Sequence, residues 1–180
     1  MGYLNADLCK FAHRWPFHWK LYRFLLHPRF WPVLLIRLSQ GAYRCRLKLF
    51  ARALALLNQI LFGCDVARGA QIEGGLYLPH PQGIVIGEYA RIGKNCIIHQ
   101  GVTLGDRGEE HGVPELRIGA EVEIATGAKI LGCLTIGDYA RIGANAVVLE
   151  NVPAAAVAVG IPARIVKYRT RTVASRSEVF

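Results

Sequence analysis

The chain has 180 residues, of which 52% are hydrophobic and 19% are charged, and its formal net charge is +9. This composition is that of a globular protein, and the length allows one domain with a small extension. All of the excess positive charge lies in residues 1–62, whereas residues 63–180 are neutral overall. The neutral remainder and the lack of a recognition motif argue against nucleic-acid binding. The basic segment could instead meet a membrane surface or an acidic partner, or be a solvated helix face.

The cysteines are widely spaced, odd in number and without a C-x-x-C pair: Cys9, Cys45, Cys64, Cys96 and Cys133. This pattern predicts reduced thiols, with neither a disulfide framework nor a metal site. The N-terminus has no secretory signal. The longest apolar stretch, residues 47–62, is interrupted by Arg52 and is shorter than the roughly 18–20 residues that a spanning helix needs. We therefore expect a cytoplasmic protein that does not cross a membrane.

Residues 19–62 are predicted to be helical, because their apolar residues recur at helical spacing with Arg and Lys between them. Pro28 and Pro32 mark the start of this segment, and Gly63 marks its end. Residues 1–62 therefore form a basic, apolar N-terminal segment.

After Gly63 the sequence period becomes six. Aliphatic residues recur at this interval, often followed by glycine, at Ile86, Ile92, Ile98 and Leu104, and again at Ile118, Ile124, Ile130, Ile136, Ile142 and Val148. A six-residue period predicts a parallel β-helix in which each hexad gives one short strand and one corner, with the aliphatic side chain inside. We assign this domain to residues 63–167 and a mobile tail to residues 168–180.

The period is interrupted between Leu104 and Ile118, which are fourteen positions apart instead of twelve. The stretch between them, GDRGEEHGVPELR, is polar, charged and rich in glycine. It predicts a loop, residues 105–117, that protrudes from the coils, where binding residues are common. A tolerated surface insertion would have the same composition.

Four stretches carry a family resemblance: GIVIGEYARIGKN, QGVTLGDRG, GAKILGCLTIGDYARIGANAVVLENVP and VGIPARIVK. They resemble the hexapeptide-repeat acyltransferases, and most closely the serine acetyltransferase branch with its relatives that acetylate bacterial exopolysaccharides, such as colanic-acid-type acetyltransferases. The resemblance implies a mainly β fold, a left-handed parallel β-helix of hexapeptide repeats with an N-terminal α-helical segment. It also implies a homotrimer that binds acetyl-CoA along the coils between subunits, without a metal.

The same resemblance places the catalytic histidine at His80, in PHPQGIVIG, and the aspartate that orients it at Asp65, in GCDVARGA. An imidazole with a pKa near about 6.5 can accept the proton of an attacking hydroxyl. A carboxylate on the other ring nitrogen holds the tautomer and stabilises the imidazolium. Outside this family context, His80 would be an ordinary loop residue and Asp65 the start of a turn.

His99 and Gln100, one coil further on, and His111 in the protruding loop are candidates for contact with the acceptor. For acetyl-CoA the resemblance points to small residues that let the pantetheine arm approach the backbone and to cations that could meet phosphates. These candidates are Ala125, Gly127, Ala128, Lys129, Arg141, Gly143, Ala144, Arg164 and Lys167. Each small residue could equally be a plain corner position.

Two departures from the serine-specific pattern favour a sugar as the acceptor. Pro79 stands where an aspartate usually precedes the catalytic histidine, and Gly112-Val113-Pro114 replaces an Arg-His-Pro run. Both missing groups would hold serine's charged ends. The resulting prediction is an acetyl-CoA-dependent O-acetyltransferase acting on a sugar of a bacterial exopolysaccharide or its lipid-linked precursor. The alternatives are a serine O-acetyltransferase of cysteine biosynthesis and a non-catalytic β-helix scaffold.

The basic N-terminal segment is then expected to rest on the anionic inner face of the cytoplasmic membrane, to cap the open end of the coil stack, or to do both. The last residue is Phe180 rather than the isoleucine with which serine acetyltransferases dock into cysteine synthase, so that complex is not expected.

Overall fold

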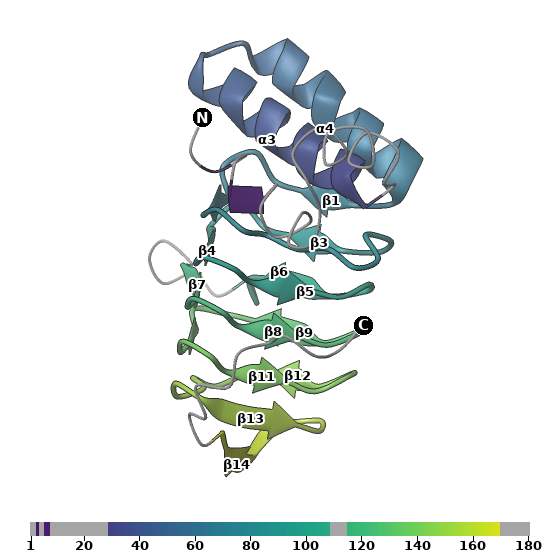
Figure 1. Cartoon of the computed structure of the whole chain (residues 1–180). Helices are drawn as coiled ribbons and strands as arrows, with labels where there is room; N and C mark the ends of the chain where they lie inside the picture. Colours follow the sequence, from purple (N-terminus) through teal and green to yellow (C-terminus); the bar gives the residue numbers. More distant parts are fainter. Residues whose placement is uncertain (1–2, 4–5, 8–28, 109–114, 170–180) are drawn as a thin grey trace, which may run out of the picture.

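The computed structural model describes residues 3, 6–7, 29–108 and 115–169. Two helices, α3 (Phe30–Arg44) and α4 (Lys48–Phe62), pack against each other above a tall stack of strand coils (Figure 1). Residues 19–62 are predicted to be helical, and most of their described part, residues 29–62, is helical. Pro32 lies inside the first turn of α3, where a missing N–H is tolerated. Gly63 ends α4 in the left-handed conformation, with φ 61°, as its position in the sequence predicts.

Polar contacts attach α3 to the first coil. The Arg37 guanidinium donates to the carbonyl oxygens of Ile72 at 2.5 Å and Glu73 at 2.6 Å. The side-chain amide of Gln40 donates to the carbonyl of Ala70 at 2.8 Å, and both residues are buried. Val33 of α3 joins the hydrophobic core of the coils. The helix pair therefore covers one end of the stack, as a cap does in repeat proteins.

The described chain then continues as short strands. They are β1 (Asp65–Val66), β2 (Gln71–Ile72), β3 (Val85–Ile86), β4 (Ala90–Ile92), β5 (Ile97–Ile98), β6 (Thr103–Gly105), β7 (Leu116–Ile118), β8 (Glu123–Ile124), β9 (Lys129–Leu131), β10 (Thr135–Ile136), β11 (Arg141–Ile142), β12 (Val147–Val148), β13 (Ala156–Val159) and β14 (Arg164–Tyr168). Each inward side chain is flanked by exposed or partly exposed neighbours, because successive residues of a strand point to opposite faces.

These strands form the three faces of a prism. Sheet A has the order β1-β3-β6-β9-β12, sheet B the order β10-β7-β4-β2, and sheet C the order β14-β13-β11-β8-β5. The chain visits A, B and C in turn, so each strand pairs in parallel with the strand one coil later; β14 is the exception and pairs antiparallel with β13.

The inward side chains stack on one another from coil to coil. Ile86, Leu104, Ile130 and Val148 are in register across sheet A, and each is at most 1% exposed. Burying one such side chain contributes roughly 1.5–3 kcal/mol. The repeated burial of these columns gives the sequence its six-residue period, and the predicted parallel β-helix is confirmed.

The coil length shows where residues are inserted. Ile86 pairs with Leu104 after 18 positions, but Leu104 pairs with Ile130 after 26. Leu104 and Ile118 lie on neighbouring sheets, so the step between them would be six positions in a regular coil and not twelve. The protruding loop therefore carries eight additional residues, and the expectation of two was wrong. Residues 109–114, including His111, lie outside the described residues.

A second, smaller insertion lies in the first coil. Val66 pairs with Ile86, and Ile72 with Ile92, after 20 positions each. The two additional residues fall between Leu78 and Ile86, in the stretch that contains His80. Because of these two residues, the inward positions before Ile86 are not separated from it by a multiple of six. The six-residue period counted from Ile86 onwards therefore did not include the first coil. The division of the chain into domains stays a prediction.

Candidate active site at a corner of the coils

His80 lies at the corner where the first coil passes from sheet C to sheet A. Its side chain is exposed, whereas Pro81 is buried and Pro79 is half-buried. The carbonyl of Pro81 accepts a hydrogen bond from the N–H of Ile84 at 3.4 Å, which closes the turn. The flanking prolines restrict the backbone. The insertion thus holds an accessible imidazole outside the regular path of the coils.

The same corner is formed in every coil by a residue in the left-handed conformation. These residues are Gly63, Gly83, Gly101, Gly127 and Asn145, with φ between 55° and 72°. A Cβ at Gly83 would lie 3.4 Å from the Cα of Gly101, so the backbones of successive coils are in close contact. Glycine occupies four of the five positions, so those four corner residues carry no side chain.

Several of the predicted site residues stack along this edge. The N–H of His99 donates to the carbonyl of Ile124, and the N–H of Ala125 donates to the carbonyl of Ile142. His99, Ala125 and Gly143 therefore lie above one another at the end of sheet C. Gln100 comes directly before the corner residue Gly101, and Ala144 comes directly before the corner residue Asn145 two coils later. Ala128 differs, because its side chain is fully buried in the core and does not face this edge.

Asp65 lies on the other side of the corner, on sheet A. It is the first residue of an outward-facing column that continues in register through Val85, Thr103 and Lys129. The ammonium group of Lys129 donates to the carbonyl of Gly101 at 2.5 Å, so it too lies at the corner. Asp65 and His80 flank the corner at the start and the end of one coil. Among the described residues, neither side chain makes a hydrogen bond to the other.

Cys64, next to Asp65, is a buried thiol. Burial raises its pKa to about 12, the Asp65 carboxylate adds to this, and a hydrogen bond with Asn58 opposes it. Cys64 therefore remains a neutral thiol at physiological pH and is not a nucleophile. The titratable side chains that flank this corner on the first coil, His80 and Asp65, are both exposed.

Gln100 has a side-chain oxygen, Oε1, that is buried and has no hydrogen-bond partner among the described residues. A buried acceptor without a partner costs stability unless a ligand or water supplies a donor. This observation separates Gln100 from the other residues of its column and favours a contact with a bound molecule.

The predicted phosphate-binding cations occupy two different places. Arg141 pairs with Glu123, with 2.8 Å between Nη2 and Oε2, and lines a cavity of about 490 Å³ together with Lys167. Arg164 instead lies 3.5 Å from the Glu150 carboxylate and does not line this cavity. Arg169, which sequence reasoning missed, does line it. Its position two residues after Lys167, on the same side of an extended strand, could have indicated this.

No group of three or more metal-ligating side chains occurs within residues 3, 6–7, 29–108 and 115–169. A cavity of about 670 Å³ lies not at this corner but on sheet B.

The coil stack and its corner define a hexapeptide-repeat transferase, and the family described as "Bacterial transferase hexapeptide (six repeats)" matches residues 116–150. Soybean serine acetyltransferase, solved as the apoenzyme and complexed with serine, is 36% identical; the alignment covers 92% of this chain and 68% of that one, with TM-scores of 0.81 and 0.82. The chain belongs to the serine acetyltransferase family. The left-handed form of the β-helix, predicted from the resemblance, is thereby confirmed.

Two further relatives support this assignment. The serine acetyltransferase of Brucella abortus, solved in complex with coenzyme A, is 32% identical, with a TM-score of 0.79 and coverage of 94% of this chain and 68% of that one. The serine acetyltransferase of Synechococcus elongatus is 39% identical over 146 residues, which are 81% of this chain and 59% of the relative. The chain thus spans about three fifths of the length of the curated relatives it matches.

The prediction of a sugar acceptor in an exopolysaccharide is wrong, because these relatives are serine acetyltransferases. It depended on Pro79 and on residues 112–114, which lie outside the described residues. A few loop positions change individual contacts, whereas the similarity extends over the whole coil scaffold. A particular closeness to colanic-acid-type enzymes is likewise not supported.

Proposed function

We propose that this chain is an acetyl-CoA-dependent serine O-acetyltransferase with His80 as its general base. The observation that carries the proposal is the 36% identity to the soybean enzyme, which was solved with serine, over 92% of this chain. The exposed imidazole of His80 at a glycine-lined corner supports the same reading.

In the proposed reaction the His80 imidazole accepts the proton of the serine hydroxyl while that oxygen attacks the carbonyl carbon of the thioester. The new C–O bond forms, the C–S bond breaks, and the proton passes from the imidazolium to the CoA sulfur. Asp65, at the start of the same coil, would stabilise the imidazolium when the two side chains come within hydrogen-bond distance.

Acetyl-CoA would lie along the edge formed by His99, Ala125 and Gly143. Because Ala125 and Ala144 have small side chains and Gly143 has none, the backbone of this edge is accessible to a pantetheine arm. The cavity lined by Arg141, Lys167 and Arg169 lies on sheet C beside this edge and would take the phosphates.

Serine would be held near His80 by His99 and Gln100. The buried Oε1 of Gln100 lacks a donor among the described residues, and the serine ammonium group is a donor of the right kind. The contribution proposed for His111 falls in the loop outside the described residues.

The homotrimer implied by the family resemblance is part of this proposal. The outward side of sheet A carries apolar residues, namely Val85, Leu131, Val147 and Leu149, of which Val85 is 41% exposed. Sheet B carries Gln71, Arg91 and Arg117 in the corresponding positions. Asp65, Thr103 and Lys129 also face outward on sheet A, but its four apolar residues distinguish it from sheet B and favour it as the surface between subunits.

The test is the release of CoA from acetyl-CoA by the purified full chain. We expect saturable release with L-serine and only background hydrolysis with L-alanine, which has the same charged ends but no hydroxyl. Binding of acetyl-CoA without any serine-dependent release would contradict the proposed acceptor. A chain that does not bind acetyl-CoA in calorimetry would contradict the acetyltransferase activity itself.

Helix α4 supports a further part of the proposal, contact with an anionic membrane surface. Its large apolar side chains face outward: Leu49, Phe50, Leu56, Leu57, Ile60 and Leu61 are 43–86% exposed. Helices α3 and α4 contain cations but no acidic residue. A second copy would bring like charges together at this face, whereas an anionic bilayer complements them. Within the described residues, no helix is long and apolar enough to cross a membrane.

We expect the chain to sediment with vesicles containing anionic phospholipid and not with neutral vesicles. Leu49→Gln combined with Ile60→Gln should abolish the effect, since these two side chains are 86% and 70% exposed and contribute little to the folded core. Equal sedimentation with neutral vesicles, or self-association abolished by the same substitutions, would contradict a lipid partner.

A further inference from the structure

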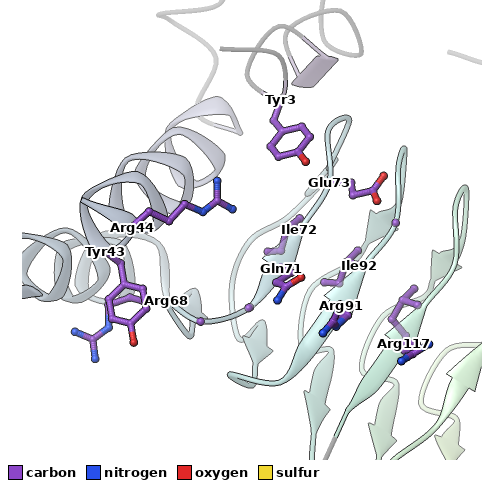
Figure 2. A pocket seen from close by; sticks show the side chains of 14 residues that line it. Tyr3, Tyr43, Arg44, Arg68, Gln71, Ile72, Glu73, Arg91, Ile92 and Arg117 are labelled. Atoms are coloured by element: carbon purple, nitrogen blue, oxygen red, sulfur yellow. The ribbon is translucent and has the colours of Figure 1, made fainter. Parts of the chain in front are cut away.

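A cavity lies between the end of α3 and the outward face of sheet B. Its volume is about 670 Å³, within the range of small-molecule sites. Its lining includes Arg44, Arg68, Arg91 and Arg117, together with Tyr43 (Figure 2). These side chains come from α3, from the turn after β1, and from β4 and β7. Residues far apart in the sequence thus bring four arginines to one cavity.

Two of these arginines are neighbours on the sheet. Arg91 and Arg117 are in register on β4 and β7, and adjacent strands lie only about 4.8 Å apart. Like charges directly opposite each other on a sheet are destabilising. A single carboxylate, Glu115, forms ion pairs with both of them. The pair therefore keeps one uncompensated positive charge.

The other two arginines come from above the sheet. The Arg68 guanidinium lies over the ring of Tyr43, 5.7 Å from its centroid, which fixes its position. Arg44 is the last residue of α3, and no hydrogen bond or ion pair of its side chain occurs in the described part of the chain. Glu73 is the acidic residue of the lining. Glu115 and Glu88 lie beside the lining, so four cations and three carboxylates gather around this cavity.

This cavity is separate from the candidate active site. Gln71, Arg91 and Arg117 form the outward column of sheet B, whereas His80 lies at the corner between sheets C and A. Arg141, Lys167 and Arg169 line a different cavity on sheet C. The cations of the two cavities belong to different faces of the prism.

We infer that the cavity on sheet B binds a phosphorylated small molecule of nucleotide size. Guanidinium groups match phosphate oxygens in charge and in bidentate geometry. The net positive charge around the cavity favours an anionic ligand over a neutral one. The exposed ring of Tyr3 on the far side of the cavity gives an aromatic base a surface to stack on (Figure 2).

The experiment is calorimetry of the full chain with pyrophosphate and with ADP, each in the presence of saturating acetyl-CoA so that the cofactor site is filled. We expect both to bind and ADP to bind more tightly. Arg91→Gln combined with Arg117→Gln should weaken pyrophosphate binding at least about tenfold. These side chains are 55% and 63% exposed, so the variant should fold. Pyrophosphate should raise the melting temperature of the wild type more than that of the variant.

Arg141→Gln is the matched control, because it removes one positive charge from sheet C. It should leave pyrophosphate binding in the presence of acetyl-CoA unchanged. Binding that acetyl-CoA displaces, or that Arg141→Gln weakens as much as the sheet B variant does, would place the anion in the cofactor site and overturn the inference. No binding of either ligand at millimolar concentration would overturn it as well. None of these outcomes depends on serine turnover, so they are independent of the proposed activity.

Discussion

The His80→Ala variant is expected to lose serine-dependent CoA release by about 10²–10⁴-fold, the contribution typical of a positioned general base. A serine hydroxyl is a weak nucleophile near neutral pH, and the imidazole removes its proton as the oxygen attacks. His80 is exposed in a surface turn, so its removal should not destabilise the coils. The measurement is kcat and KM for L-serine, with calorimetry of acetyl-CoA binding to show that the variant retains its cofactor site.

His99→Ala is the control of the same residue type, one coil away at the same edge. Because His99 is proposed to contact the acceptor and not to move its proton, we expect a raised KM for serine with a much smaller loss of kcat. Asp65→Asn should lower kcat and retain acetyl-CoA binding, since it removes the charge that would stabilise the imidazolium. A His80→Ala variant that keeps most of its kcat would exclude His80 as the base.

The Asp7→Ala variant is expected to lose about 3–5 kcal/mol of unfolding free energy, the largest effect on stability that we predict. The Asp7 side chain is fully buried, with its Oδ2 2.8 Å from the Nε of Arg37. It also accepts hydrogen bonds from the N–H groups of Gly75 at 2.6 Å and Leu76 at 2.9 Å. Removing the carboxylate leaves a guanidinium that is only 10% exposed and two buried amides without their partner.

Denaturant unfolding monitored by circular dichroism measures this loss. Asp106→Ala, which removes an exposed aspartate, should cost far less. The double variant Asp7→Ala with Arg37→Ala should be less destabilised than the sum of the two single variants, because each single change leaves a buried charge without its ion-pair partner. A loss below about 1 kcal/mol for Asp7→Ala, or additive effects, would show that this ion pair does not hold the N-terminal segment to the first coil.

Much of the fold is readable from local sequence. The interval of six between Ile86 and Leu104, and again from Ile118 to Val148, predicts the coils because every sixth side chain must be buried. Gly63 marks the change from helix to strand, since a left-handed residue ends the helix. The motif PHPQGIVIG indicated His80 through its family resemblance, and the structure places it at an exposed corner.

The acceptor could not be inferred correctly from the same motifs. Pro79 and residues 112–114 change local contacts, and they led to a sugar where the comparisons point to serine. Similarly, Ala128 and Ala125 look alike in the sequence, but Ala128 is buried and Ala125 is partly exposed on the edge. Which of two small residues faces outward depends on the exact position of the corner within the hexad.

The sequence by itself determined the repeat, the helical N-terminal segment and the region of the candidate catalytic corner, because each depends on neighbours within about one coil. Only the tertiary structure decided which residues from different coils share a surface. Arg44, Arg68, Arg91 and Arg117 meet at one cavity because coils of 20 and 26 residues align β2, β4 and β7, and because hydrogen bonds attach α3 to the first coil. The physical reason is that a hydrophobic period specifies which side chains point inward, whereas the insertions specify which outward side chains become neighbours.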